Sequence, residues 1–167
     1  FGVVKYSPSG GELWVIEFPD LYFPSNIFDP SEARNMISRD NHIFLLGDTG
    51  GSAGHIFTMS KFKHDGTVDW YRYLVPTSSQ GSTAGTTDAN GNLYMTGRRI
   101  KVFPSHIMYQ TFKADSNGDQ VWSAQYVGPV PGIHKANAIA LDNAGNVYVT
   151  GQSPGAAVSC HGPTVGQ

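Results

Sequence analysis

The chain has 167 residues, 11 Lys and Arg against 13 Asp and Glu, and a formal net charge of −2. This balance excludes the strongly basic surface that recruits nucleic acid or an anionic membrane. Only 14% of the residues are charged, whereas 20 are Gly and 10 are Pro, a composition rich in tight turns and typical of an all-β protein. No apolar run approaches the roughly 18 residues that a membrane-spanning helix needs.

Three segments of the chain repeat one pattern, which runs from a Lys through a Gly turn to a Trp. They read KYSPSGGELW, KFKHDGTVDW and KADSNGDQVW, and in each the Trp lies four residues after the turn Gly: Trp14, Trp70 and Trp122. A second motif lies between these segments and ends in Gly47, Gly97 and Gly151. The period of about fifty residues falls in the range of four-stranded propeller blades.

Period-two alternation between turn residues predicts four strands in each repeat, which we name a to d in chain order. The predicted order is c-d, then a-b-c-d twice, then a-b. Asn-Gly and Asp-Gly turns join the strand pairs, because these residues accept the positive φ of short hairpins. In the first a–b turn, Asp40, Asn41 and His42 replace a turn that is two residues longer in the other copies.

The predicted blades occupy 1–152, with repeat motifs near 1–47, 55–97 and 106–151, and a Gly- and Pro-rich tail follows at 153–167. Phe1 opens inside a strand-like run without a signal peptide, which favours a trimmed piece of a longer protein. Propellers usually close with about four to eight blades, and open sheet edges favour aggregation. We therefore predict an all-β propeller, a partial ring of four-stranded antiparallel blades, which further blades from the parent chain or another subunit complete.

A Trp at the same place in every repeat predicts a structural role. Stacked sheets lie roughly 10 Å apart, so one large ring per layer fills the gap between two blades. Trp14, Trp70 and Trp122 are therefore interpreted as wedges between neighbouring blades. The recurrent Lys5, Lys61 and Lys113 are interpreted as stems that cover an aromatic ring.

These motifs resemble a known repeat family. Residues 136–151 contain the pattern Asp-x-x-Gly-Asn-x-Tyr-Val-Thr-Gly, and residues 1–14 contain Lys-Tyr followed by Gly-x-x-x-Trp. The pair of patterns resembles the SBBP-type β-propeller repeat of bacteria and archaea. The resemblance implies a secreted or cell-surface propeller and no particular reaction. The quinoprotein-type repeat and the Asp-box of sialidases are also similar but match fewer of the motifs.

Candidate binding residues lie on the predicted d–a and b–c loops, since repeat folds leave chemistry to their loops. Arg98, Arg99 and Lys101 form a basic cluster suited to a carboxylate, a phosphate or an acidic sugar, because Arg presents a bidentate fork. Tyr22 and Phe23 lie in the longest loop, where exposed aromatic rings stack on sugars or dock a protein. The alternatives are a solvated basic loop and an aromatic loop that packs on the neighbouring blade.

His134 is the single side chain best suited to acid–base work, and an exposed loop histidine is the alternative interpretation. Asp115, Asn117 and Asp119 alternate like the ligands of a short calcium loop. Calcium takes about six or more oxygens, so a hairpin stabilised by Asp and Asn is the plainer interpretation. We predict no cofactor. Cys160 is the single cysteine and leaves the redox compartment undecided.

The sequence contains no nucleophile elbow, phosphate-binding loop or zinc-protease motif. We therefore expect a non-catalytic secreted or cell-surface module that serves as a structural scaffold or binds a protein or glycan. One alternative is a portion of a propeller enzyme of the lyase, glycosidase or quinoprotein type, with its site on the face of the d–a and b–c loops. The other is a metal-dependent, lectin-like role.

Overall fold

The computed structural model describes residues 2–17, 32–49, 55–101 and 106–155. Every regular element in these ranges is a β-strand, and neighbouring strands pair in antiparallel fashion. The described part of the chain holds no helix long and apolar enough to cross a membrane. The predicted all-β class is confirmed.

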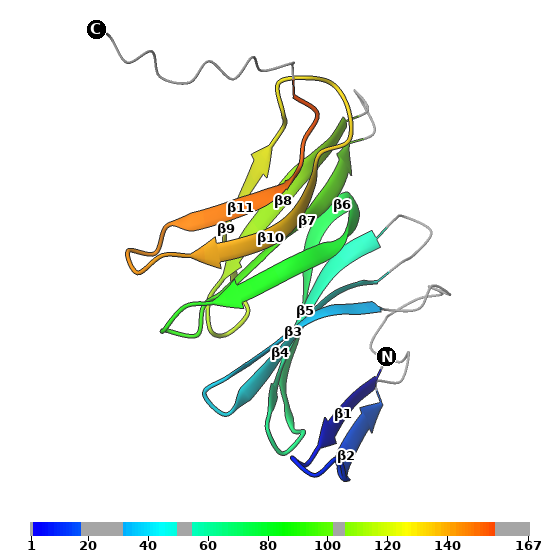
Figure 1. Ribbon diagram of the computed structural model, residues 1–167, viewed down its shortest axis with the longest axis vertical. Coiled ribbons are helices and arrows are strands. Elements are labelled where there is room, and N and C mark those ends of the chain that lie inside the picture. Colours follow the sequence, from blue (N-terminus) through cyan, green and yellow to red (C-terminus); the bar gives the residue numbers. More distant parts are fainter. Residues whose placement is uncertain (1, 18–31, 50–54, 102–105, 156–167) are drawn as a thin grey trace, which may run out of the picture.

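The strands follow the predicted order, with a half-blade at each end and two whole blades between them (Figure 1). Half-blade 1 is β1 (Gly2–Tyr6) and β2 (Glu12–Glu17). Blade 2 is β3 (Glu32–Arg39), β4 (His42–Thr49), β5 (His55–Lys63) and the first part of β6 (Val68–Thr87). Blade 3 is the rest of β6, β7 (Leu93–Lys101), β8 (His106–Ala114) and β9 (Gln120–Tyr126). Half-blade 4 is β10 (Lys135–Leu141) and β11 (Val147–Gln152).

Strand β6 is longer than the sequence predicts, because it serves two blades in succession. It pairs with β5 up to Leu74 and with β7 from Ser79 onward. Ser79 itself pairs with His55 on one side and with Arg99 on the other. The predicted loop at 76–81 is therefore wrong: strand d of blade 2 continues into strand a of blade 3, and the two blades form one seven-stranded sheet.

The Gly that ends the strand b motif faces a bulge in strand a. The register of the a–b ladder shifts around Arg34 in blade 2 and around Thr83 in blade 3. A Cβ on Gly47 or Gly97 would overlap a backbone carbonyl oxygen of the bulged strand, and the same holds for Gly151. The recurrent Gly is thus explained by the close approach of two backbones rather than by a turn.

An aromatic ring, a Lys and a Trp lie side by side across each whole blade, on strands b, c and d. We name this set the aromatic row: Phe44–Lys61–Trp70 in blade 2 and Tyr94–Lys113–Trp122 in blade 3. The Lys ammonium lies 5.7 Å from the Phe44 ring centroid and 5.0 Å from that of Tyr94. The Trp centroid lies 6.4 Å from that of Phe44 and 6.2 Å from that of Tyr94. Each row is therefore held by ring packing and by the Lys ammonium near the ring.

Trp14 and Trp70 reach the c–d turn of the blade that follows. The indole Nε1 of Trp14 donates to the carbonyl of His64, and that of Trp70 to the carbonyl of Ser116, both at 3.1 Å. A Cβ on Gly118, the turn residue with a φ of 85°, would lie 3.0 Å from the Trp70 ring. Glycine at this turn position thus meets both the backbone conformation and the space that the neighbouring indole leaves.

The apolar core lies between the blades. Its largest part is a cluster of buried side chains from β4 to β8 that includes Leu46, Phe57 and Met95, with Trp70 packed against it. A smaller cluster joins half-blade 1 to blade 2, where Val3 and Phe62 are buried together. The indole rings thus lie at the edges of clusters that neighbouring blades share.

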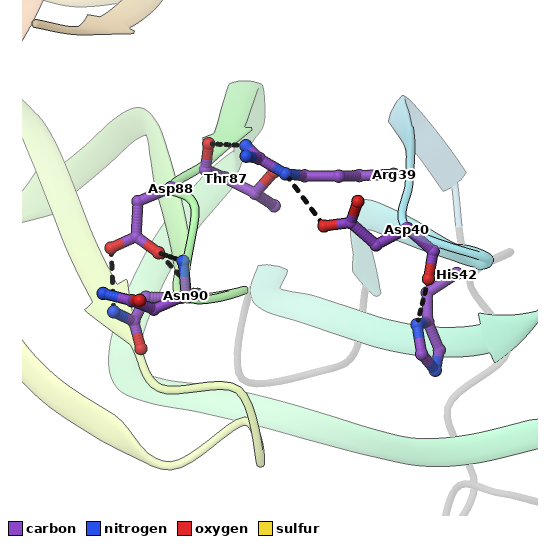
Figure 2. Close-up of polar contacts among 7 residues, drawn as sticks. Arg39, Asp40, His42, Thr87, Asp88 and Asn90 are labelled. Carbon is purple, nitrogen blue, oxygen red and sulfur yellow. Dashed lines mark hydrogen bonds and ion pairs between the residues drawn. The ribbon is translucent and has the colours of Figure 1, made fainter. Parts of the chain in front are cut away.

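The a–b turns lie at the other end of the blades from the d–a and b–c connections. In the shortest one, Asp40 and Asn41 have φ values of 47° and 61°, as a two-residue hairpin turn requires. Figure 2 shows Arg39 beside this turn extending to blade 3, where its Nη1 donates to the carbonyl of Thr87 at 2.9 Å. His42 Nδ1 lies 2.9 Å from the carbonyl of Asp40. This shortened turn thus carries a polar link between two blades.

Candidate functional site

A polar cavity of about 190 Å³ lies where the inner strands of blades 2, 3 and 4 meet. It is lined by Arg34 of β3, Asp48 of β4, residues 81–83 of β6, Arg98 of β7 and Lys135 of β10. Arg34 and Lys135 lie near the beginning of strands a, whereas Asp48 and Arg98 lie near the end of strands b. The cavity, which we name the basic cavity, therefore lies at the end of the blades that carries the d–a and b–c connections.

Two carboxylates compensate the charge of Arg34. Its Nε donates to the Oδ1 of Asp48, a buried carboxylate, and its Nη2 lies 2.5 Å from the Oε2 of Glu32. The hydrogen bond to Asp48 raises the pKa of Arg34 above its ordinary value, although partial burial opposes the shift. This ion-pair network fixes one wall of the cavity and uses the acidic oxygens nearest to it.

Arg98 and Lys135 are the remaining cations of the basic cavity. Neither makes an ion pair with another residue of the described ranges. Between them, the Thr83 hydroxyl donates to the carbonyl of Ala136 at 2.5 Å, which ties blade 3 to half-blade 4. The cavity is smaller than the roughly 300–1,000 Å³ of sites for drug-sized ligands, so its size suits a single anionic group.

The predicted basic cluster of Arg98, Arg99 and Lys101 is divided by the strand that carries it. All three residues belong to β7 rather than to a loop, so their side chains alternate between the two faces of the sheet. Arg98 lines the basic cavity, whereas the Nη1 of Arg99 donates to the Oε1 of Gln110 at 3.3 Å. The side chain of Lys101 lies outside the described set. The loop assignment is therefore wrong, and any binding role of these residues stays a prediction.

His134 is buried rather than exposed, which corrects the interpretation as a loop histidine at the surface. Its Nε2 lies 3.0 Å from the carbonyl of Val130, and its Nδ1 lies 2.8 Å from the hydroxyl of Ser153. A carbonyl only accepts hydrogen bonds, so Nε2 carries a proton. Gly128 makes room for the ring, since a Cβ there would overlap the imidazole. In this arrangement the imidazole holds the connection between β9 and β10 in place.

The remaining candidates fall into two groups. Tyr22, Phe23 and Cys160 lie outside the described residues. The carboxylate of Asp115 accepts the backbone amides of Asn117 and Asp119, both at 2.9 Å, which is the geometry of a hairpin turn stabilised by its own Asp. In the described ranges, no group of three or more His, Cys, Asp or Glu side chains is arranged to hold a metal ion.

Sequence reasoning missed Arg34, Asp48 and Lys135 as neighbours of Arg98. A signal was present: Asp48 follows Gly47 and Arg98 follows Gly97, so both occupy the position directly after the Gly of strand b. Superposing the repeats on that Gly would have predicted that these two side chains occupy equivalent places near the ring centre. The ion pair that compensates only one of the cations depends on three-dimensional contacts that no local pattern encodes.

The blades and their open ends define the class of protein: this chain is part of a β-propeller. Residues 121–156 match the family model of SBBP, a β-propeller repeat. The match begins in β9 and includes the whole of half-blade 4, and it confirms the resemblance of this chain to that repeat family. No curated protein matches the chain.

Proposed function

We propose that this chain is a non-catalytic segment of a secreted or cell-surface propeller and that its basic cavity binds an anionic group of a glycan or a protein. The observation that carries this proposal is the pair Arg98 and Lys135, which line one cavity without an ion pair in the described part of the chain. The extracellular location rests on the resemblance to the SBBP repeat alone.

The composition of the cavity supports binding rather than chemistry. Its carboxylate, Asp48, is held by Arg34, and an ion-paired buried carboxylate is a poor general acid or base. The Arg98 guanidinium offers a planar pair of donors to two oxygens of one carboxylate, and the Lys135 ammonium adds a second positive charge. A carboxylate of an acidic sugar matches both the donor geometry and the small volume, so we expect the uronic acid class of glycan as ligand.

The test is a titration of the chain with an oligosaccharide of uronic acids, followed by calorimetry at low salt. A hydrogen bond to a charged group contributes roughly 1.5–3 kcal/mol, so Arg98→Ala and Lys135→Ala should each weaken binding by about tenfold or more. Arg99→Ala is the matched control, because it removes the same charge one residue away from the other face of β7. A neutral oligosaccharide of equal length should not bind. Equal loss in Arg98→Ala and Arg99→Ala would contradict the proposal.

A further inference from the structure

The outer edge of half-blade 4 exposes a ring that both whole blades bury. Tyr148 of β11 occupies the position of Phe44 in β4 and Tyr94 in β7, the first member of the aromatic row. Phe44 and Tyr94 are each 3% exposed, whereas Tyr148 is 58% exposed. In the described ranges β11 pairs with β10 alone, so no Lys and no Trp from strands c and d lie beside Tyr148.

Half-blade 1 shows the complementary deficit. Tyr6 of β1 occupies the position of Phe62 in β5 and Ala114 in β8. Those two side chains are 1% and 2% exposed, whereas Tyr6 is 61% exposed. Lys5 and Trp14 lie opposite each other across β1 and β2, so half-blade 1 holds the second and third members of an aromatic row and lacks the first.

We propose that the β1–β2 hairpin of a second copy of this chain completes half-blade 4. The order of strands in the finished blade would be β10, β11, β1 and β2, as in β3 to β6. The ladders of blades 2 and 3 fix the register, since Phe44 pairs with Lys61 and Tyr94 pairs with Lys113. Tyr148 of one copy would therefore pair with Lys5 of the other, and Val149 with Val4.

The inter-blade contact of Trp122 points to the same partner. Trp14 and Trp70 each donate to the carbonyl two residues before a turn Gly in the following blade. No such turn follows Trp122 in the described ranges. The turn of half-blade 1 is unoccupied in turn, since a Cβ on Gly10 would meet no atom within 4 Å. The carbonyl that corresponds to those of His64 and Ser116 is that of Pro8, so the indole of Trp122 would donate to Pro8 of the second copy.

A second copy is favoured over another protein because one chain holds both halves of the missing blade. Each junction joins different surfaces, and such head-to-tail contacts give a closed ring only when the rotation per copy divides a full turn. Two copies, each with three blades' worth of strands, would supply six blades, within the usual range of about four to eight. The two junctions of that ring would be identical and would leave no open strand edge.

Sedimentation velocity of the whole chain over a series of concentrations tests the proposal. We expect a reversible dimer with twice the 18.0 kDa mass of one chain. Tyr148→Asp should raise the dissociation constant at least about thirtyfold, as loss of a central aromatic contact does. Val68→Asp is the matched control: this side chain is also exposed and lies outside both open ends, and its counterparts Glu12 and Gln120 are polar. A monomer at every concentration, or a dimer that Tyr148→Asp leaves intact, would overturn the proposal.

A mixing experiment tests the head-to-tail arrangement. Tyr148→Asp damages one end of the chain and Tyr6→Asp damages the other, so each variant alone should sediment as a monomer. A mixture should contain a heterodimer, because the intact β1–β2 hairpin of the first variant meets the intact β11 edge of the second. Failure of the mixture to associate, while circular dichroism shows both variants folded, would contradict the arrangement.

A disulfide tests the register. Directly opposed residues of antiparallel strands have Cα atoms about 4.5–5.5 Å apart, within the range that a disulfide spans. In a Cys160→Ser background, Val4→Cys with Val149→Cys should give covalent dimers under mild oxidation. Val4→Cys with Thr150→Cys should not, because Thr150 points to the opposite face of β11. Equal yields would contradict the predicted register. The basic cavity takes no part in these junctions, so this inference and the proposed binding function stand or fall separately.

Discussion

Blade 3 and half-blade 4 begin with the same a–b motif, and their shared part has the same local structure. Tyr94 donates to Asp88 at 3.1 Å, and Tyr148 donates to Asp142 at 3.0 Å. Their surroundings differ, because β8 and β9 cover Tyr94 and no described strand covers Tyr148. The comparison teaches that the sequence between the turn Asp and the Tyr determines the local hydrogen bonds, whereas burial depends on strands c and d.

The comparison can be broken most severely at the two tyrosines. Tyr94→Ala should lower the free energy of unfolding by about 3–5 kcal/mol, because it removes a buried ring from the aromatic row. Tyr148→Ala should cost less than about 1 kcal/mol in a monomeric sample, since its ring is already exposed. Urea denaturation of dilute protein measures both. Equal losses would show that half-blade 4 is as well packed as blade 3.

The Gly of strand b offers the next largest contrast. A Cβ on Gly97 would overlap both the carbonyl of Gly81 and the ring of Phe57, so Gly97→Ala should cost about 2–3 kcal/mol. A Cβ on Gly151 would overlap the backbone of β10 alone, and that half-blade has a free edge that can shift. Gly151→Ala should therefore cost less. Thermal denaturation of the two variants measures the difference, and a larger loss for Gly151→Ala would contradict this reasoning.

The indole hydrogen bonds allow a finer comparison. Trp70→Phe removes the donor to Ser116, and a lost hydrogen bond of this kind costs about 1 kcal/mol. Trp122→Phe removes a donor for which the described residues provide no carbonyl of this kind, so we expect a loss of only a few tenths of a kcal/mol. Urea denaturation of the monomer is again the measurement. A similar cost at both positions would show that Trp122 already has an equivalent partner within the chain.

The turn aspartates should respond alike in both regions. Hydrogen bonds from Asn146 and the turn lower the pKa of Asp142, and at Asp88 those from Asn92 and neighbours outweigh the opposing effect of partial burial. A carboxyl whose pKa is lower in the folded state stabilises the fold above its unfolded value, about 3.9, and that contribution is lost as the pH falls through the folded value. Asp88→Asn and Asp142→Asn should each flatten the loss of stability below about pH 4. Unfolding midpoints measured from pH 7 to pH 3 check this, and an unchanged slope would count against the turn network.

Much of the fold could be predicted because the information is local and repeated. The Gly-x-x-x-Trp spacing located strand d three times, and the Asn-Gly and Asp-Gly turns located the hairpins. The continuous strand β6 could not be predicted, because Pro76 and the polar residues after it read as a loop, and only pairing with both β5 and β7 makes them strand.

The site was less predictable than the fold. Arg98 and Arg99 are adjacent in sequence and looked like one cluster, yet strand geometry separates them and brings Arg98 to Lys135 of another blade. His134 looked exposed because it follows a Pro- and Gly-rich segment, whereas the space left by Gly128 and the hydroxyl of Ser153 bury it. Contacts between blades decide both cases, and no periodic pattern within one blade encodes them.

The most direct test of the account is amide hydrogen exchange of β7 and β11 at low and at high protein concentration. The account predicts that peptides from 93–98 are protected at both concentrations, because β7 lies between two strands. Peptides from 147–152 should exchange quickly in dilute protein and become protected when it is concentrated. Protection of 147–152 equal to that of 93–98 in dilute, monomeric protein would contradict the claim that half-blade 4 is an open half of a blade.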